Sequence, residues 1–453
     1  MYRLKFHQSE KETVFLPSSL YNNEITHISF GTQQHKCKVI RYDSDEKNTI
    51  HISRDVADIL LIPHEASIRA FKKDNVLHIG PLIGIFTAGF TGSILRPVGE
   101  RSIFFSKLLS MANSVGVCIF VFGAHQINWD NATIAGYFFT KKGWEQCEVP
   151  FPNVIYDRLP NRKTESHPAI AQIKKRLSND YLIPIYNPKF FNKTEIYELL
   201  EQHNQLSQYT PKTISRPSWL DIDQMVKQFG HVFVKPANGS LGLGVFQILY
   251  SEKEQAYYCR YRDEEDKNRL QRFMNLSTLA DYLFKDRDLE YYVVQQGISL
   301  IRMDKNQIDF RVHTNQDENG VWHVGAIAAK VAGRGSVTTH INSGGSVHTL
   351  EEVIVEKDEA KRINMKIEEA VLAISEYLSE KMNGLVGEIG FDIGVDREGR
   401  IWLFEANAKP GRSIFHHPKL HEADKFTRRL TLEYAIYVMK QSIYNPEKIY
   451  SLV

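Results

Sequence analysis

Two acidic side chains and an amide come close together in sequence near the C-terminal end of the chain. Residues 387–411 read GEIGFDIGVDREGRIWLFEANAKPG, two apolar strands around the turn DREG. In an antiparallel hairpin, Asp392 and Glu405 can lie on neighbouring strands with their side chains on one face, and Asn407 shares the face of Glu405. Mg²⁺ uses such oxygen donors when phosphates supply its remaining ligands. The pattern therefore favours a magnesium site over a solvated acidic hairpin.

A glycine-rich loop joins two apolar runs in residues 232–245, VFVKPANGSLGLGV, with Lys235 at the end of the first run. Glycine lets backbone N–H groups approach phosphate oxygens, and lysine adds a positive charge. The loop is neither a Walker loop, since GK[ST] is missing, nor a dinucleotide fingerprint. A hairpin that covers phosphates fits the pattern, and so does an ordinary hairpin with a surface lysine. The loop residues expected to contact nucleotide are Gly239, Ser240, Gly242 and Gly244.

Two cations alternate with apolar residues on two further expected strands, DFRVH at 309–313 and the run at 326–330. This alternation places Arg311 and Lys330 on one sheet face, where they suit the charge of a triphosphate. Paired surface cations would produce the same pattern.

The strand YYVVQQGI at 291–298 ends in polar residues and a glycine. Such an end can present backbone groups and the amide of Gln296 to a flat adenine ring. The residues concerned are Gln295, Gln296, Gly297 and Ile298. In isolation, an ordinary strand end explains this segment better.

Three regions are expected to position these side chains. Residues 1–79 alternate short β-like runs with polar turns and predict a small, mostly β module. Residues 80–186 contain a strand, a helix over about 101–114 and a second strand, as in a small α/β domain. Residues 187–453 carry all the motifs above. Helices are expected there over residues 193–203 (after the N-cap residue Asn192), 365–382 and 422–444.

The composition favours a soluble globular protein of roughly two to four domains. Of the 453 residues, 42% are hydrophobic and 24% are charged, and the net charge of +2 argues against a nucleic-acid binder. No run approaches the about 20 apolar residues of a membrane span, and the N-terminus lacks a signal-peptide pattern. The histidines are scattered and show no metal-ligand spacing. The four cysteines are also far apart and form no CxxC pair, so the chain is expected to be intracellular with reduced thiols. The charge cluster at 260–272 is expected to be a solvated loop or helix face.

Taken in chain order from Lys193 to Asn407, these motifs resemble the ATP-grasp superfamily over roughly residues 187–437. In the whole chain, a β module precedes GPLIGIFT, and PFPNVIYDRLPNR leads into the ATP-grasp-like region. This plan resembles the YheC/YheD-type endospore-coat-associated ATP-grasp family of spore-forming bacteria, and within it the YheD type. The resemblance implies an α/β fold class, an α+β ATP-grasp fold preceded by a small α/β pre-ATP-grasp domain and the N-terminal β module.

The resemblance also implies roles for the nucleotide-binding residues. Lys193 matches the lysine near the α- and β-phosphates, and Lys235 matches the lysine on the strand before the glycine loop. Gln296 falls at the adenine hinge, where many superfamily members carry an acid. Adenine recognition is therefore expected to rest more on the backbone around Gly297 and Ile298.

Three residues are predicted to be catalytic. Arg311 matches the arginine of the D-x-R motif, and Lys330 matches a basic residue that contacts the γ-phosphate. Arg412, directly after Pro-Gly, is expected to touch an acceptor or an oxyanion. Related proteins carry an asparagine where this chain has His340, and Asn342 is expected to make the corresponding contact.

The implied function is an ATP-grasp ligase that uses ATP and one or two Mg²⁺ (or Mn²⁺) ions. It would phosphorylate a carboxylate and let an amine displace the phosphate. The implied setting is sporulation, in the mother-cell cytoplasm or at the spore coat, with coat proteins as partners and a small-molecule or peptide substrate. Residues 80–185 are expected to contribute to the acceptor site, through Arg158, Asn161 and Arg162. Two alternatives stay open, an ATP-binding coat protein with little catalysis and an ATP-grasp phosphotransferase.

Overall fold

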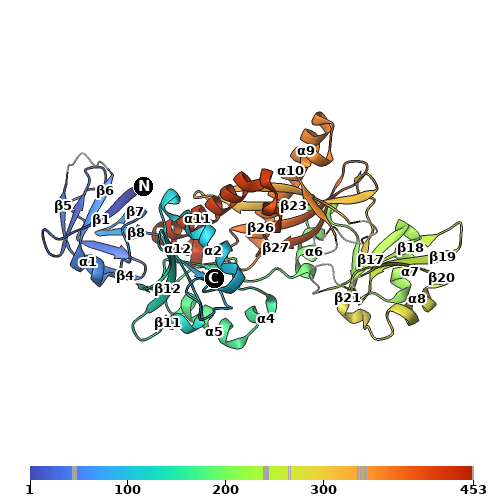
Figure 1. Ribbon diagram of the computed structural model, residues 1–453, viewed down its shortest axis with the longest axis horizontal. Helices are drawn as coiled ribbons and strands as arrows, with labels where there is room; N and C mark the ends of the chain where they lie inside the picture. Colours follow the sequence, from blue (N-terminus) through green and yellow to red (C-terminus); the bar gives the residue numbers. More distant parts are fainter. Residues whose placement is uncertain are drawn as a thin grey trace.

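The computed structural model describes residues 1–42, 48–237, 244–263, 265, 267–333, 336, 339 and 344–450. Over these residues the chain forms four β-sheets arranged along the long axis of the molecule (Figure 1). Their order in space differs from their order in sequence. The fourth sheet, drawn in orange, lies between the second sheet and the third sheet, drawn in green and yellow.

The first sheet contains eight strands in the order β4-β3-β8-β7-β1-β6-β2-β5. These strands are β1 (Tyr2–His7), β2 (Thr13–Leu16), β3 (His27–Phe30), β4 (Gln33–Lys36), β5 (Lys38–Arg41), β6 (Thr49–Ser53), β7 (Ser67–Lys73) and β8 (Val76–Gly80), with one short helix, α1 (Arg54–Ile59). The runs KVIRY, TIHI and VLHI, expected as strands, form β5, β6 and β8. The domain boundary placed after residue 79 stays a prediction.

The second sheet is mixed and has the order β11-β12-β10-β9-β14-β15, with β13 paired to β12. Its strands are β9 (Leu82–Phe86), β10 (Cys118–Phe122), β11 (Ile127–Asn128), β12 (Thr133–Thr140), β13 (Gly143–Pro150), β14 (Val154–Asp157) and β15 (Ile185–Tyr186). Its helices are α2 (Ser102–Leu109), α3 (Ala112–Val115), α4 (Arg162–Glu165) and α5 (Pro168–Asn179). Strands β9 and β10 are parallel, as the expected βαβ unit requires. The helix expected over 101–114 is interrupted at Ser110 and Met111, so it forms two shorter helices.

The third sheet is antiparallel, in the order β16-β21-β17-β18-β19-β20. Its strands are β16 (Thr213–Ser215), β17 (His231–Pro236), β18 (Phe246–Ser251), β19 (Ala256–Arg262), β20 (Asn268–Phe273) and β21 (Tyr292–Gln296), with helices α7 (Trp219–Phe229) and α8 (Leu276–Leu283). The prediction for the charge cluster at 260–272 was wrong, because Arg260 and Arg262 lie on β19 and pair with β20. On β19 these two arginines alternate with the buried Cys259 and the partly buried Tyr261.

The fourth sheet has the order β25-β24-β23-β26-β27, with β22 paired to β23. Its strands are β22 (Arg302–Met303), β23 (Asn306–Gln316), β24 (Trp322–Val331), β25 (Ser346–His348), β26 (Glu388–Val395) and β27 (Ile401–Asn407). The remaining helices are α6 (Lys193–Glu201), α9 (Leu350–Val353), α10 (Lys357–Lys381), α11 (His421–Tyr444) and α12 (Pro446–Tyr450). Asn192 caps α6 as expected, accepting a hydrogen bond from the Thr194 N–H.

Helix α11 joins the second and fourth sheets. Its residues Leu432, Tyr434 and Met439 are buried with Ile83 and Val121 of the second sheet. The helix also packs against β23 and β24 of the fourth sheet. A helix buried on several sides carries apolar residues around much of its circumference. This helix therefore fixes the two sheets in one arrangement.

All four cysteines, Cys37, Cys118, Cys147 and Cys259, are free. Across the described part of the chain, no helix combines the length and the apolar character needed to cross a bilayer.

Candidate functional site

The acidic hairpin forms as β26 and β27, and an irregularity in it brings the two acids together. Asp392 is the Cα partner of Glu405, and the register shifts directly after Asp392 so that Phe404 has no partner. Without this bulge, strict alternation would put Glu405 on the buried face that Leu403 occupies. The bulge therefore turns Glu405 to the face of Asp392, and Asn407 follows on that face.

Three cations contact this acidic pair. The carboxylate of Asp392 lies 3.1 Å from Arg311 Nη1 through Oδ2 and 2.9 Å from Lys330 Nζ through Oδ1. Lys193 Nζ lies 3.4 Å from Glu405 Oε2. Strand β23 lies between β24 and β26, and its Arg311 is the Cα partner of Asp392 on β26. The structure thus brings the cations of β23 and β24 to one face, next to the two acids.

A third carboxylate, that of Asp309, lies in the same cluster and was not predicted. Its Oδ1 lies 3.0 Å from Lys330 Nζ, although without hydrogen-bond alignment, and Oδ2 accepts a hydrogen bond from the hydroxyl of Thr339. Burial alone would lower the pKa of Lys330, but Asp309 and Asp392 raise it above its usual value. Lys330 therefore keeps its charge. The sequence contained a signal for this third carboxylate. Asp309 stands two residues before Arg311 in DFRVH, and alternate residues of a strand lie on one face.

Lys235 belongs to the third sheet, and a series of hydrogen bonds links it to the fourth. Its Nζ donates to Gln295 Oε1 at 2.7 Å, and Gln295 Nε2 donates to the Tyr197 hydroxyl at 2.9 Å. Tyr197, on α6, donates in turn to the carbonyl of Phe404 at 2.7 Å. Burial and the positive charge of Lys193 together lower the pKa of Lys235 to about 8, although Glu405 and Asp392 act in the opposite direction. The link through Tyr197 had no signal in the sequence, because it depends on how α6 packs against both sheets.

A cavity lies between α6 and the third sheet, with both lysines that are predicted to bind nucleotide in its wall. Residues lining it include Lys193, Thr194, Tyr197, Thr213, Lys235 and Val293. At the neighbouring strand end, Gln296 Oε1 accepts a hydrogen bond from the backbone N–H of Lys212 at 3.2 Å. The N–H of Gly297 donates to the carbonyl of His231 at 2.9 Å. The expected adenine hinge is thus held to two adjacent segments, and Ile298 is buried beside it.

Replacing Gly297 by alanine is expected to destabilise the hinge. An added Cβ would lie 2.1 Å from Cδ2 of His231, so the imidazole or the strand end must shift. Such overpacking costs about 1–3 kcal/mol of unfolding free energy, and displacement of the hinge should also weaken ATP binding. Chemical denaturation and calorimetric titration with ATP measure the two effects. Gly92, where a Cβ meets nothing within 4 Å, supplies the control, and equal behaviour of Gly297→Ala and Gly92→Ala would refute the prediction.

Arg412 is held by α11 rather than by the acidic hairpin. Its Nη2 lies 2.6 Å from Asp424 Oδ1, and Arg428 Nε lies 3.0 Å from the other oxygen of Asp424. Burial lowers the pKa of Arg412, with the charge of Arg428 acting in the same direction. Its contact with an acceptor or oxyanion stays a prediction.

The three candidate acceptor residues occupy different surroundings. Arg158 lies 3.0 Å from Glu388 at the start of β26 and donates to the carbonyl of Pro410 at 3.2 Å, so it reaches the loop after the acidic hairpin. Asn161 caps α4, and Arg162 donates to the carbonyl of Phe191.

Several expected nucleotide contacts lie outside the described residues. These are Gly239, Ser240, Gly242 and Asn342, together with His340. Gly244, the last glycine of the loop, is described and has a φ of 70°.

Comparison with known proteins places these features in context. The model of the family described as YheC/D like ATP-grasp matches residues 182–438. The chain is 41% identical over 443 residues to endospore coat-associated protein YheD of Bacillus subtilis (strain 168), which covers 98% of this chain and 97% of that protein. It is 23% identical over 321 residues to endospore coat-associated protein YheC of the same strain, covering 68% of this chain and 84% of that protein.

Among solved structures, D-alanine–D-alanine ligase from Bacillus anthracis aligns with a TM-score of 0.45 at 14% identity. The alignment covers 80% of this chain and 99% of that chain.

Proposed function

The chain belongs to the YheC/D like ATP-grasp family, and from that premise we propose that it is an ATP- and Mg²⁺-dependent ligase. In this proposal ATP binds between the third and fourth sheets and activates a carboxylate for attack by an amine. The observation that carries the proposal is the gathering of four cations, from α6 and from the third and fourth sheets, around one acidic pair. The cations are Lys193, Lys235, Arg311 and Lys330, and the acids are Asp392 and Glu405.

The charge of this cluster suits a nucleotide. With Asp309 included, the four cations face three acids, an excess of one positive charge. ATP carries more negative charge than a single Mg²⁺ ion balances, so this excess is complementary to the complex. Burial strengthens the attraction, because charges interact more strongly away from water.

Asp392, Glu405 and Asn407 would hold the Mg²⁺ ion. Their carboxylate and amide oxygens are the hard donors that Mg²⁺ prefers, and the bulge at Phe404 places both acids on one face. When bound, Mg²⁺ offsets negative charge on the phosphate oxygens. The donor set therefore fits the ion.

The proposed reaction needs positioned charge rather than a protein nucleophile. A carboxylate oxygen of the substrate attacks the γ-phosphorus, the bond from that phosphorus to the β-phosphate oxygen breaks, and ADP leaves. Arg311 and Lys330 stabilise the charge on the transferring phosphoryl group. An amine then attacks the acyl carbon, phosphate leaves with the bonding electron pair, and the nitrogen loses a proton.

Mass spectrometry of reactions with ATP, Mg²⁺ and mixtures of amino acids and short peptides tests the proposal. A condensation product and ADP release that depend on both an acid and an amine support a ligase. A phosphorylated product without condensation would instead favour a phosphotransferase. ATP binding without ADP release in any mixture would favour an ATP-binding protein without catalysis.

ATP affinity is expected to depend on pH through Lys235. Because burial lowers its pKa to about 8 in the nucleotide-free chain, its amine is mostly neutral at about pH 9. Phosphate oxygens favour the charged amine, so ATP binding above the pKa takes up a proton. The affinity should be nearly constant below about pH 8 and should fall up to about tenfold per pH unit above it.

Calorimetric titration in two buffers of different ionisation enthalpy measures this proton uptake. Lys235→Arg supplies the control, since a guanidinium stays charged over this range. The same pH dependence in this variant would show that another group is responsible.

We also propose that the chain acts during sporulation, because the two relatives of Bacillus subtilis are endospore coat-associated proteins. A fluorescent fusion should then be found in the mother-cell cytoplasm and around the forespore. A fusion confined to vegetative cells would contradict this setting.

A further inference from the structure

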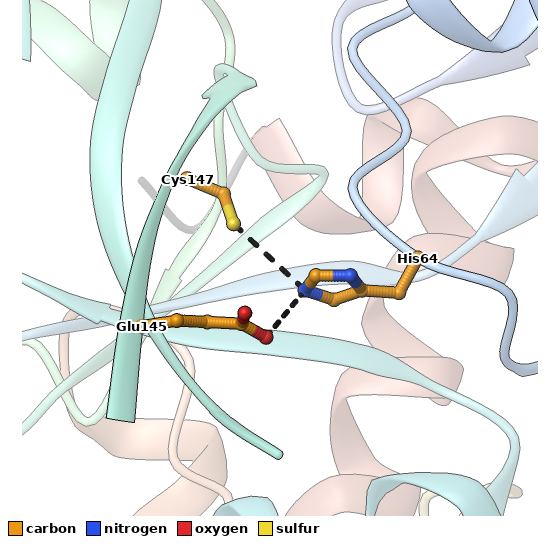
Figure 2. A group of neighbouring side chains, drawn as sticks. All are labelled: His64, Glu145 and Cys147. Carbon is orange, nitrogen blue, oxygen red and sulfur yellow. Dashed lines mark hydrogen bonds and ion pairs between the residues drawn. The ribbon is translucent and has the colours of Figure 1, made fainter. Parts of the chain in front are cut away.

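A histidine, a glutamate and a cysteine converge at the junction of the first two sheets, apart from the nucleotide site. In Figure 2 the imidazole of His64 faces the side chains of Glu145 and Cys147. Nε2 of His64 lies 3.0 Å from Oε1 of Glu145 and 3.8 Å from Sγ of Cys147. One ligand atom from each residue lies within 4.8 Å of the other two.

The fold explains why the three side chains meet. Glu145 and Cys147 are alternate residues of β13, so both point to one face of the strand. Across the pair, Cys147 faces Gly136, and the ring of Phe120 occupies the place that a Gly136 side chain would take. Phe138 faces Glu145 and packs edge-on against the imidazole of His64, with ring centroids 5.6 Å apart. The imidazole is therefore supported from the second sheet although it belongs to the segment between α1 and β7.

We propose that His64, Glu145 and Cys147 bind a divalent transition-metal ion of the Zn²⁺ type. Zinc with bonds of about 2.0–2.2 Å to nitrogen and oxygen and about 2.3 Å to sulfur, at tetrahedral angles, separates N from O by about 3.3 Å and N from S by about 3.6 Å. The observed separations of 3.0 and 3.8 Å differ from these values by only about 0.2–0.3 Å. The third pair, a carboxylate oxygen of Glu145 and Sγ of Cys147, lies within 4.8 Å, so all three donors can approach a common ion.

The donor types select the class of ion. Sulfur and imidazole nitrogen suit Zn²⁺ and its transition-metal neighbours, whereas Mg²⁺ prefers oxygen ligands. A thiolate and a carboxylate together balance the two positive charges of the ion. Binding forms the metal–sulfur bond and releases the thiol proton to solvent. Three protein donors leave a fourth position for water.

Solvent can reach this site. The side chains of His64 and Glu145 are 35% and 37% exposed, and Cys147 is half-buried. An ion can therefore enter without unfolding of the surrounding strands, in contrast to the fully buried core nearby.

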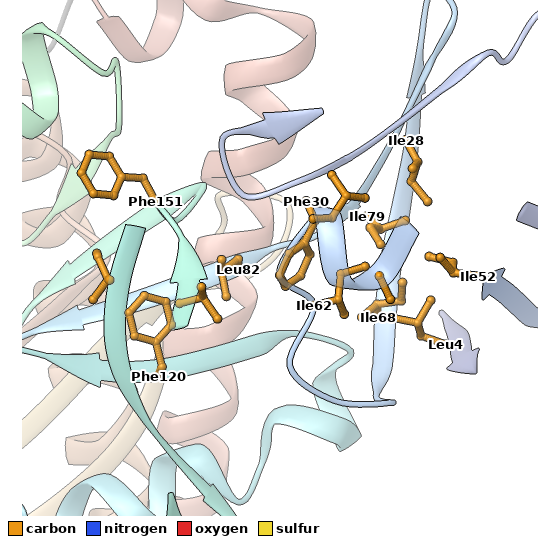
Figure 3. Packing of buried hydrophobic residues seen from close by; sticks show 14 of the residues in the cluster. Leu4, Ile28, Phe30, Ile52, Ile62, Ile68, Ile79, Leu82, Phe120 and Phe151 are labelled. Atoms are coloured by element: carbon orange, nitrogen blue, oxygen red, sulfur yellow. The ribbon is translucent and has the colours of Figure 1, made fainter. Parts of the chain in front are cut away.

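The site lies at the rim of an apolar junction between the first two sheets. Figure 3 shows Phe30 and Ile62 packed in the same cluster as Leu82, Phe120 and Phe151 of the second sheet region. His64 follows Ile62 by two residues, so it continues the junction at its edge. A bound ion would tie the segment of His64 to β13 and would fasten the first sheet to the second.

Titration of the EDTA-treated, dialysed full-length chain with Co²⁺ tests the proposal. We expect one thiolate-bound Co²⁺ per chain, seen as thiolate-to-cobalt charge-transfer absorption in the near ultraviolet and displaced by Zn²⁺. The site at Asp392 and Glu405 offers only oxygen ligands and cannot produce this absorption, so failure of the proposed ligase function would leave the result unchanged. Zn²⁺ should also raise the melting temperature, because it binds only the folded chain.

Cys147→Ser is expected to lose the absorption and the Zn²⁺-dependent rise in melting temperature. His64→Gln should weaken Co²⁺ binding at least about tenfold. Cys118→Ser provides the matched control, since Cys118 is another half-buried thiol of the same sheet. Retained absorption in Cys147→Ser, its loss in Cys118→Ser, or no thiolate–Co²⁺ absorption in the unaltered chain would each overturn the assignment. A circular dichroism spectrum of each variant confirms that the comparison is between folded chains.

Discussion

Replacing Asp392 by asparagine is expected to lower ATP turnover at least about a hundredfold while the chain still folds. The carboxylate of Asp392 accepts hydrogen bonds from Arg311 and from Lys330, and it is a proposed metal ligand. Asparagine keeps the shape of the side chain but removes its charge and turns an N–H group toward one of these cations. The variant therefore loses metal affinity and the alignment of both cations at once.

ADP release at saturating ATP, measured over a range of Mg²⁺ concentrations, quantifies the loss. Glu405→Gln should act in the same direction. Glu398→Gln is the matched control, because it removes a carboxylate from the same hairpin at a side chain that is 66% exposed. Unaltered turnover in Asp392→Asn or Glu405→Gln would rule out the metal assignment.

Much of the candidate site follows from local sequence patterns. Strand alternation alone places Arg311 and Lys330 on one face, and their shared contact with Asp392 agrees with that reasoning. The ATP-grasp fold class and the resemblance to the YheC/YheD-type family are confirmed by the family match and the high identity to YheD. These signals are local because each motif lies on one strand or one hairpin.

The features that sequence reasoning missed depend on irregularity or on tertiary packing. Glu405 was expected on the face of Asp392, but the bulge that puts it there, with Phe404 as the extra residue of β27, was not expected. Uninterrupted alternation from Leu403 would have sent Glu405 into the core. Tyr197 joins the two sheets through contacts between residues about 100 and 200 positions apart, which no local pattern records.

The prediction for residues 260–272, which was made from their charge pattern, was wrong. Both signs of charge occur there, which suggested a solvated loop or helix face, yet these residues include parts of β19 and β20. A strand at the edge of a sheet can expose most of its side chains, as β20 does, so it can carry several charges. Likewise, His64 and Cys147 are 83 positions apart, so the absence of metal-ligand spacing in the sequence did not exclude their meeting.

The loop after the acidic hairpin is fastened to the second sheet by a buried ion cluster. Lys409 Nζ lies 2.7 Å from Asp157 Oδ1 and 2.6 Å from Glu165 Oε2. The side chain of Lys409 is 2% exposed and that of Asp157 is fully buried. Lys174 Nζ lies 2.7 Å from the other oxygen of Asp157. Lys409 follows Asn407 by two residues, so this cluster ties the proposed metal-binding strand to β14.

Replacing Lys409 by methionine is expected to lower the free energy of unfolding by about 3 kcal/mol. Loss of one partner from a buried ion pair costs about 3–5 kcal/mol, and the lower end applies because Asp157 keeps Lys174. Chemical denaturation measures the effect, and Lys419→Met is the control, since its pair with Glu352 is 64% exposed on the lysine side and should contribute under about 1 kcal/mol. Equal losses in the two variants would mean that the cluster does not hold the loop. A larger loss in Lys409→Met, together with weaker ATP binding, would show that the second sheet supports the nucleotide site through this lysine.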